Sequence, residues 1–391
     1  MKILTLSNLY PRPDRPTFGM FNQQLFRQFD RCEGVSLGNV CLVPEWRIWR
    51  WTKLSRWRAP VHALKATNYE PVFYFPVIGR SVGAALYALS RNRMRRHIRG
   101  TDVVFASWLY PDGVYATRLQ KDTQARVWVM ALGSDTFHLR NARRRKQVLK
   151  ADATIAGYIC VCAPVAQRLI DAGIAQERVH VVPNGVDPEQ FYYVAQEVAF
   201  AALADARSAV AAAKALTRID VLFVGNLVAE KGPDVCLEAF IACCSNGGET
   251  RQLVYIGHGP MLGALQQRAE EAGLADHVHF IACRPHDEIL NWMASAECLC
   301  LSSRSEGMPN VVLEALAAGL PVAATDVGAC REMLEGESAG RVVSPDDVPA
   351  LAEAMEALLG MDIDREALSQ RHRQYTWRHQ AERILELINE K

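Results

Sequence analysis

The stretch at residues 298–331, CLCLSSRSEGMPNVVLEALAAGLPVAATDVGACR, constrains the fold more than any other part of the chain. Two short apolar runs in it are typical of buried strands, and helical apolar spacing lies between them. Pro309 suits the first turn of that helix, where its missing N–H costs no hydrogen bond, and Gly319 suits the position just past its end. The expected order is strand, turn, helix and strand, at residues 298–301, 302–307, 310–318 and 320–324.

Two glutamates frame the predicted turn and helix. Glu306 borders the amino end of the helix, and Glu314 lies inside it. Because side chains on a helix lean towards its amino end, Glu314 should point back to the end that Glu306 borders. Backbone N–H groups and the positive end of the helix dipole make that end an anion site, so one carboxylate can bind sugar hydroxyls and the other a ribose. The plainer interpretation is an ordinary strand–turn–helix with two solvated glutamates.

The stretch matches a known signature in register. It resembles the donor-binding region of glycosyltransferase family 4, whose pattern is E-G-x-P, a second Glu eight positions after the first, and then A-x-x-x-G-x-P-V-x-A-T-D-x-G-G-x-x-E. One departure is Ala329, which replaces the second glycine of the late pair. The matching residues are Glu306, Gly307, Pro309, Glu314, Ala315, Gly319, Pro321, Val322, Ala324, Thr325, Asp326, Gly328 and Glu332.

The resemblance implies the GT-B fold, an α/β architecture of two Rossmann-like doubly wound domains that face each other across a cleft. Alternating strand and helix patterns in both halves of the chain agree with it. We expect residues 1–190, with a crossover helix at 375–391, to form an acceptor-binding domain. Residues 191–374 should form the domain that binds the nucleotide-sugar donor.

The resemblance also assigns roles to single residues. Glu306 would hold the donor sugar, Glu314 the ribose, and Lys231 the diphosphate. Asn226 stands at a position that is commonly basic in the family, where its amide can still donate a hydrogen bond. The other positions would shape the donor pocket or contact its phosphates and base: Gly19, Gly257, Gly259, Arg284 and the amides of Gly307, Met308, Asn310 and Val311.

A family motif is altered in the first half of the chain. Members usually show His-Gly-x-Asp where this chain has Leu132, Gly133 and Asp135. Since leucine cannot replace the histidine chemically, we expect Asp135 to be the polar contact near the sugar. Asp135 and Glu306 are therefore the predicted catalytic residues.

The implied reaction is sugar transfer with retention of anomeric configuration, without a metal and without a cofactor. An epimerase on the same fold and a non-catalytic nucleotide-sugar binding protein are the alternatives. GHGPMLG, at 257–263, resembles a dinucleotide fingerprint. The late last glycine and the lack of a suitably placed acidic residue argue against a nicotinamide site. The adjacent Asp346 and Asp347 are expected to cap a helix, not to bind a metal.

Composition indicates a globular chain. Its 391 residues suit two domains of ordinary size, and 50% of them are apolar. No window reaches the roughly 18 consecutive apolar residues of a membrane span, so no transmembrane helix is expected. The eleven cysteines lie mostly in apolar runs, which favours buried free thiols in a reducing cytosol over disulfides or a zinc site.

Charge is divided unevenly along the chain. Residues 1–190 carry 28 Lys and Arg against 14 Asp and Glu, whereas the remainder carries 16 against 29. Segment 44–60 interleaves four tryptophans with lysine and arginine, a composition that suits an anionic membrane surface. A solvated basic helix with a buried tryptophan face is the alternative. Nothing else in the chain supports nucleic acid as a partner.

The opening SNLYPRPDRPTFGMF resembles one subgroup of the family, the transferases of bacterial exopolysaccharide and teichuronic-acid assembly. With the basic first half, this resemblance predicts a lipid-linked or oligosaccharide acceptor in cell-surface polysaccharide synthesis. It also predicts a cytoplasmic location, with peripheral attachment to the inner face of the plasma membrane.

Overall fold

The computed structural model describes residues 1–16, 18–58, 60, 64, 67–75, 81–120, 123–204, 216–245, 251–336, 339–359 and 361–390. The chain forms two compact units. The N-terminal unit consists of Met1–Asn184 and Trp377–Lys391, and the C-terminal unit consists of Gly185–Thr376. The boundaries expected from the sequence are 190 and 375.

The described strands of the N-terminal unit pair in parallel in one sheet of order β3-β2-β1-β4-β5-β6-β7. The chain starts at the centre, builds outward to β3, and returns to the centre to add β4 through β7. The carboxyl ends of β1 and β4 therefore flank the switch point, where open α/β sheets bind ligands. The strands are β1 Lys2–Ser7, β2 Ser36–Pro44, β3 Thr67–Val72, β4 Val103–Ser107, β5 Arg126–Ala131, β6 Ile155–Cys160 and β7 Val179–Val181.

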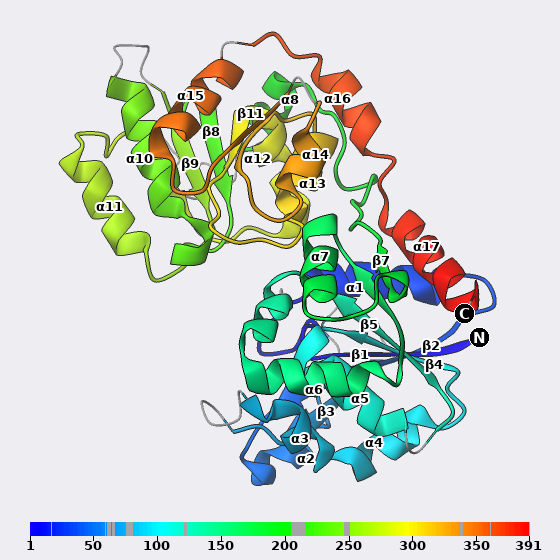
Figure 1. Ribbon diagram of the computed structural model, residues 1–391. Helices are drawn as coiled ribbons and strands as arrows, with labels where there is room; N and C mark the ends of the chain where they lie inside the picture. Colours follow the sequence, from blue (N-terminus) through cyan, green and yellow to red (C-terminus); the bar gives the residue numbers. More distant parts are fainter. Residues whose placement is uncertain are drawn as a thin grey trace. The chain divides into compact units, whose positions relative to one another are not determined.

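Helices connect these strands, and the last helix of the chain returns to this unit. That helix, α17 (Trp377–Glu390), packs against α1 (Met20–Arg31), as Figure 1 shows. It provides the crossover helix that the sequence predicts. The other helices are α2 Trp51–Leu54, α3 Gly83–Ala88, α4 Arg91–Ile98, α5 Val114–Leu119, α6 Ala142–Asp152 and α7 Ala163–Asp171, with short turns η1 Ile48–Arg50, η3 Leu109–Gly113, η5 Ser134–Arg140 and η6 Gln176–Arg178.

The C-terminal unit repeats the plan with a parallel sheet of order β10-β9-β8-β11-β12-β13. Its switch point lies between β8 and β11. The strands are β8 Ile219–Val224, β9 Leu253–Ile256, β10 Val278–Ile281, β11 Ala296–Leu301, β12 Val322–Thr325 and β13 Gly340–Val343. The helices and turns are α8 Gln196–Ala202, η8 Ala229–Lys231, α10 Pro233–Ser245, α11 Leu262–Glu271, η9 His286–Glu288, α12 Ile289–Ser295, α13 Asn310–Ala317, α14 Cys330–Leu334, α15 Val348–Leu359 and α16 Arg365–His372.

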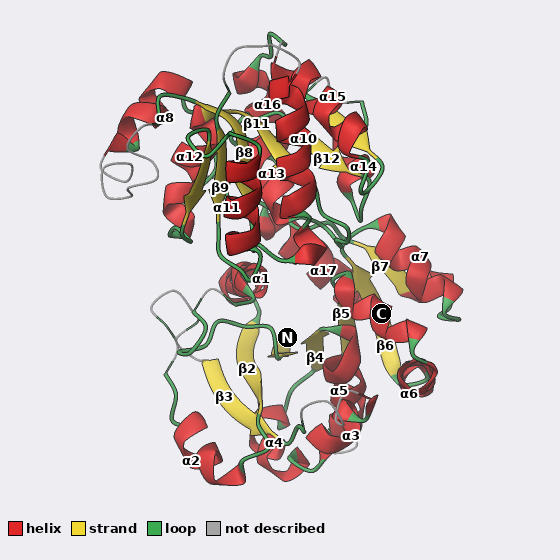
Figure 2. Cartoon of the chain, turned by 90° about the vertical axis from the view of Figure 1, so that its left-hand side faces the viewer, coloured by secondary structure: helices red, strands yellow, loops and turns green. Residues whose placement is uncertain are grey.

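Both faces of this second sheet are covered by helices (Figure 2). On β11, Leu299 and Leu301 belong to one buried cluster, while Cys298 and Cys300 belong to the cluster on the opposite face. A strand buried on both faces needs apolar residues at successive positions, which explains the run CLCL. The predicted doubly wound α/β fold is thus confirmed within each unit.

The stretch at 298–331 folds as predicted. It supplies β11, helix α13 and strand β12, and Pro309 immediately precedes the helix. Gly319 follows the helix with φ +78°, and a Cβ there would lie 2.4 Å from the carbonyl oxygen of Arg365. The strand–turn–helix–strand prediction is therefore confirmed.

The four tryptophans of segment 44–60 do not share one face. Trp51 donates from its indole nitrogen to the carbonyl of Glu45 (3.3 Å), and Trp57 packs against Tyr69. Trp46 and Trp49 are 41% and 70% exposed. The segment thus divides into a packed pair, Trp51 and Trp57, beside β3, and an exposed pair, Trp46 and Trp49, beyond it.

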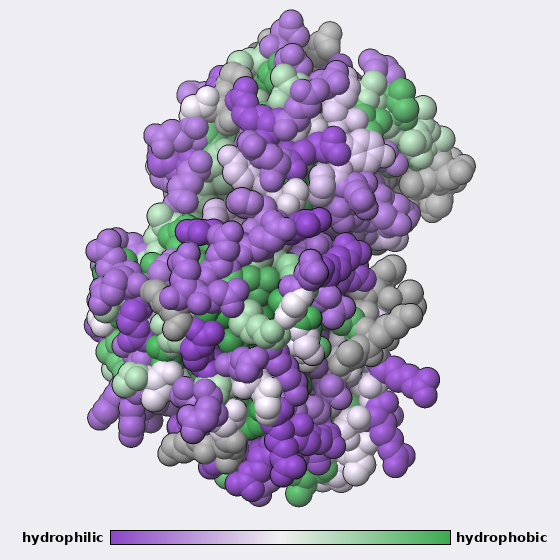
Figure 3. Space-filling view, turned by 90° about the vertical axis from the view of Figure 1, so that its right-hand side faces the viewer, coloured by the Kyte–Doolittle hydropathy of each residue, from purple (hydrophilic) through white to green (hydrophobic). Residues whose placement is uncertain are grey.

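On the face drawn in Figure 3, hydrophilic residues surround patches of apolar ones. Among the described residues, no helix combines the length and hydropathy needed to cross a membrane.

Candidate active site

Two loops meet at the switch point of the C-terminal unit. One follows β8 and contains Asn226 and Lys231, and the other follows β11 and contains Glu306. Because β8 and β11 are neighbours in the sheet, their carboxyl ends bring residues 75 positions apart into contact.

An ion pair joins the two loops. The Nζ of Lys231 lies 2.6 Å from Oε1 of Glu306, and the Ser303 hydroxyl donates to the same oxygen at 2.7 Å. The side chain of Glu306 is 11% exposed and that of Lys231 is 33% exposed. The structure thus brings together the predicted diphosphate cation and the predicted sugar-binding carboxylate.

Arg304 holds the same two loops at a second point. Its guanidinium donates to both oxygens of Asp234 (3.0 and 2.7 Å), to Asp346 (2.8 Å) and to the carbonyl of Ala229 (2.5 Å). These hydrogen bonds, above all those with Asp234, raise the pKa of Arg304. Sequence reasoning missed this residue, although it lies two positions before Glu306.

The two adjacent aspartates have different roles. Asp347 accepts from the N–H of Ala350 (3.1 Å) at the start of α15, so the predicted helix cap is confirmed there. Asp346 instead has φ +61° and pairs with Arg304.

Glu314 has an unpredicted partner. Its Oε1 lies 3.0 Å from Nε2 of His286, and Nδ1 of that ring lies 3.1 Å from Oε1 of Gln190. Burial alone would lower the pKa of His286, but the hydrogen bond and the charge of Glu314 outweigh it and raise the pKa. The histidine follows the predicted base-contacting position Arg284 by two residues, which is the only signal that the sequence offers.

Other predicted donor residues line adjacent loops. Arg284 directs its guanidinium to Glu288 (2.6 and 2.8 Å), which leaves its backbone as the predicted contact with a base. A Cβ on Gly257 would lie 1.9 Å from the carbonyl oxygen of Gly225, and one on Gly259 would lie 2.2 Å from that of Leu227. The two glycines therefore let the loop after β9 pack directly on the loop that carries Asn226, which is exposed.

The loop after β11 is fixed at its far end by α14. The N–H of Ala329 donates to the carbonyl of Gly307 (2.8 Å). Ala329 has φ −87°, which any residue adopts. Alanine is therefore unstrained at this position, where the family usually has glycine. Gly328 is different, because it has φ +55° and its backbone lies directly against the loop.

Helix α13 begins at Asn310, beside Gly307 and Met308, and Pro309 provides no side-chain cap. Its amino end, with Val311 in the first turn, borders Glu306. The dipole of such a helix end favours an anion beside it.

The N-terminal unit contains the two remaining predicted site residues. Gly19 has φ +72° at the amino end of α1, where a Cβ would lie 2.4 Å from the carbonyl carbon of Leu9. Asn22 donates to the carbonyl of Leu9 (2.7 Å), and Asp112 accepts from the backbone and side chain of Asn8 (2.6 and 3.1 Å). These contacts fix the loop after β1 at the switch point.

Asp135 is fully buried. Its carboxylate accepts from the backbone N–H groups of Leu109 (2.8 Å), Leu132 (3.0 Å) and Gly133 (2.9 Å). Burial raises the pKa of Asp135 even though these amides oppose the rise. Asp135 therefore ties the loops after β4 and β5 together, and its catalytic role stays a prediction.

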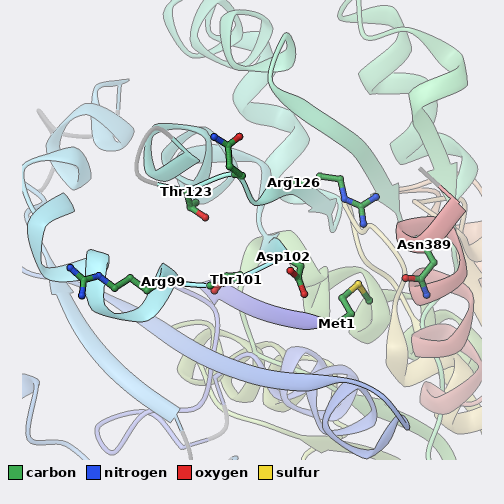
Figure 4. Close-up of a pocket in the computed structure, with 9 residues that line it drawn as sticks. Met1, Arg99, Thr101, Asp102, Thr123, Arg126 and Asn389 are labelled. Carbon is green, nitrogen blue, oxygen red and sulfur yellow. The ribbon is translucent and has the colours of Figure 1, made fainter.

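A surface hollow of the N-terminal unit lies at the opposite edge of its sheet. It is lined by residues at the amino ends of β1, β4 and β5, including Asp102 and Arg126. Figure 4 shows Arg99 and Arg126 on opposite sides of Asp102. The two cations therefore do not converge on one point of the hollow. Among the residues that the structure describes, no group of His, Cys, Asp and Glu is placed to hold a metal ion.

Known proteins resemble both units. Residues 53–190 match the family profile described as "Glycosyltransferase Family 4", and residues 207–375 match "Glycosyl transferases group 1". A D-inositol 3-phosphate glycosyltransferase of Jonesia denitrificans is 33% identical over 221 residues, which are 54% of this chain and 50% of that protein. The chain thus spans about half the length of the first curated relatives it matches.

One relative matches over most of its length. The putative teichuronic acid biosynthesis glycosyltransferase TuaC of Bacillus subtilis is 26% identical over 384 residues, covering 91% of this chain and 88% of TuaC. Among solved structures, HepE of Anabaena in complex with UDP has a TM-score of 0.75 at 16% identity, with both chains fully covered. Sucrose-phosphate synthase of Thermosynechococcus elongatus has a TM-score of 0.74 at 17% identity, with 100% and 99% covered.

Two Rossmann-like units, each matched by a glycosyltransferase profile, place the chain among the glycosyltransferases of the GT-B class. The chain is a member of glycosyltransferase family 4.

Gly328→Ala should destabilise the chain more than an ordinary glycine replacement does. A Cβ there would lie 2.0 Å from the carbonyl oxygen of Gly307 and 2.9 Å from that of Glu306. Gly273→Ala is the matched control, because Gly273 has φ +71° with open space around its Cβ position. Left-handed backbone costs an alanine roughly 1–2 kcal/mol at either position, and only Gly328→Ala adds the clash. Urea unfolding measures the free energy of unfolding of both variants. Equal losses would show that the loop can move away from the added methyl group without cost.

Proposed function

We propose that the protein transfers a sugar from a nucleotide-diphosphate sugar to a growing cell-surface glycan. The observation that carries this proposal is the Lys231–Glu306 pair at the switch point, with Glu314 within the adjoining helix. The full-length similarity to a putative teichuronic acid biosynthesis glycosyltransferase supports the class of product.

The donor is proposed to be a nucleoside diphosphate sugar. HepE, whose fold this chain shares, is described in complex with UDP and with UDP-glucose. In this chain Lys231 offers a cation and the amino end of α13 offers a positive dipole to a diphosphate. Glu314 would accept from the ribose hydroxyls, with His286 holding the carboxylate in place.

The ion pair suggests how the donor enters. Without a donor, Lys231 and Glu306 neutralise each other across the two loops. A diphosphate that takes over Lys231 would release Glu306, whose carboxylate would then accept hydrogen bonds from the donor sugar. The binding energy of the diphosphate would in this way prepare the sugar site.

Transfer would proceed with retention and without a metal. As the bond to the diphosphate breaks, negative charge grows on the leaving oxygen, where Lys231 and the amides of Gly307, Met308, Asn310 and Val311 would stabilise it. The sugar becomes positive, as in glycoside hydrolysis. The leaving oxygen would then accept the proton of the attacking acceptor hydroxyl, on the same face of the sugar.

The acceptor is proposed to be lipid-linked, with the enzyme attached to an anionic membrane. Trp46, Ile48, Trp49 and Phe75 form an exposed group, the tryptophan patch, just beyond β2 and β3. Trp46 contacts Trp49 and Phe75 at ring-centroid distances of 5.9 and 5.8 Å. Arg47 and Arg50 flank the patch and share one carboxylate, that of Glu45 (2.9 and 3.1 Å), which leaves a net positive charge. Interfacial tryptophans beside basic residues favour anionic lipid surfaces.

Changing each glutamate should separate donor binding from transfer. Glu306→Ala should abolish sugar transfer while UDP affinity stays the same or rises several-fold, because Lys231 loses its internal partner. Glu314→Ala should weaken UDP binding by about 10- to 150-fold, the scale of one charge-assisted hydrogen bond of roughly 1.5–3 kcal/mol. Calorimetry with UDP, and a transfer assay, measure the two effects. Equal loss of UDP affinity in both variants would refute this division of roles.

Activity should survive excess EDTA. Lys231 and the end of α13 take the place that a divalent cation would occupy on the diphosphate. The assay is a time course of sugar transfer with and without chelator. A large loss that added Mg²⁺ or Mn²⁺ restores would contradict the proposed phosphate site.

Membrane attachment should depend on the exposed pair of tryptophans. The protein should float with phosphatidylglycerol vesicles at low salt and much less with phosphatidylcholine vesicles. Trp46→Ser combined with Trp49→Ser should reduce flotation strongly. Leu89→Ser is the control, because Leu89 is 71% exposed in the same unit but outside the tryptophan patch. If the unaltered protein stays at the bottom of the gradient with anionic vesicles, the proposed membrane attachment is wrong.

A further inference from the structure

Arginines and aromatic rings gather at one end of the N-terminal sheet. Phe137, His138 and Arg140 belong to the turn after β5, Arg144 to the helix α6 that follows, and Arg168 to α7, which follows β6. We call these five residues the arginine cluster. Because β5 and β6 are neighbouring parallel strands, the turn after β5 and the start of α7 lie at their carboxyl ends, the edge of the sheet where this fold places its ligands. Arg168 lies in the last turn of α7 and reaches the ring of Phe137.

The phenyl ring of Phe137 brings two of the guanidinium groups together. The Cζ atom of Arg140 lies 4.5 Å from the ring centroid, and that of Arg168 lies 5.2 Å from it. An aromatic face stabilises a cation without neutralising its charge. The two positive charges are therefore held near each other while both remain available to an anion.

The cluster lacks acidic partners among the described residues. Three guanidinium nitrogens of the cluster are buried and have no hydrogen-bond acceptor among the described residues. They are Nε and Nη2 of Arg168 and Nε of Arg144. Arg144 contacts the ring of Tyr110 and donates to Nδ1 of His138 (2.7 Å). Leaving buried donors of a charged group unpaired is costly, so such groups are normally satisfied.

Neighbouring titratable groups do not supply the missing negative charge. Burial, followed by the charge of Arg144, lowers the pKa of His138 to about 4, so the imidazole is neutral at physiological pH. Asp135 lies in the same turn, but its carboxylate accepts from three backbone amides. The excess positive charge of the cluster is therefore not compensated by either residue.

We propose that the arginine cluster binds a phosphate or diphosphate group carried by the acceptor. This rests on the proposed function, in which the N-terminal unit receives the acceptor. The planar guanidinium donates paired hydrogen bonds that match the oxygens of a phosphate, and several arginines match the charge of a diphosphate. Such a group would bring negative charge to arginines that have no acidic partner among the described residues. The cluster would thus select acceptors that carry phosphate close to the receiving sugar.

Calorimetry with pyrophosphate tests the proposal. The full chain is first saturated with UDP, so that the donor site in the C-terminal unit is occupied, and pyrophosphate is then titrated. Binding should be measurable in the unaltered protein. Arg140→Gln combined with Arg168→Gln should weaken it by about tenfold or more, the scale of a lost charge-assisted hydrogen bond. Arg140→Gln alone, at an exposed position, should weaken it in the same direction and guards against a misfolded double variant.

Lys150→Gln is the matched control, because it removes one exposed positive charge from α6 outside the cluster. Its pyrophosphate affinity should stay within about twofold of the unaltered value, since an exposed charge outside the binding site contributes little to binding. An equal loss in Lys150→Gln and the cluster variants would reduce the effect to general charge and overturn the proposal. No pyrophosphate binding beside bound UDP would also overturn it, as would binding of glucuronate in place of pyrophosphate.

A second titration identifies the source of the phosphate. Geranyl diphosphate binding with the same dependence on Arg140 and Arg168 would indicate a lipid-linked acceptor, whereas binding of pyrophosphate alone would indicate a phosphate on the glycan. Both results support the subsite. The initial UDP titration reports separately on the proposed donor site. If UDP does not bind, but pyrophosphate binds the unaltered protein and not the cluster variants, the proposed function is contradicted and the anion subsite is supported.

Discussion

The ion pair between Lys231 and Glu306 is the contact on which the candidate site depends. It joins the loop after β8 to the loop after β11 at the centre of the second sheet, with 2.6 Å between Nζ and Oε1. Arg304, in the loop after β11, ties that loop to the start of α10 through Asp234 and to the loop after β13 through Asp346. In the proposed function, a ligand replaces each partner of this ion pair while Arg304 holds the loop backbones in place.

The two units use the same fold for different chemistry. Each has a parallel sheet with a switch point, and each places charged side chains beyond the carboxyl ends of its strands. In the C-terminal unit both predicted carboxylates have a partner, Lys231 for Glu306 and His286 for Glu314. In the N-terminal unit the arginines beside Phe137 lack carboxylate partners among the described residues. Paired side chains suit a site in which an entering ligand replaces one of the partners. Arginines without carboxylate partners suit a site that binds an anion.

Much of the fold could be predicted because local signals agreed with each other. The apolar runs, Pro309 and Gly319 located β11, α13 and β12, since each reports on its own neighbourhood in the chain. Contacts between distant segments could not be found in this way. His286 and Glu314 are 28 positions apart, and neither position alone shows that the pair forms. The motif around Asp135 likewise does not reveal that backbone amides surround its carboxylate.

A crystal structure of the chain soaked with UDP tests the central claim most directly. The account predicts density for the diphosphate against Nζ of Lys231 and the amino end of α13, and for the ribose against Glu314. It also predicts that the distance from Nζ of Lys231 to Oε1 of Glu306 lengthens beyond its present 2.6 Å as the phosphate replaces the carboxylate. UDP bound elsewhere on the chain, or bound here with the ion pair intact, would contradict the account.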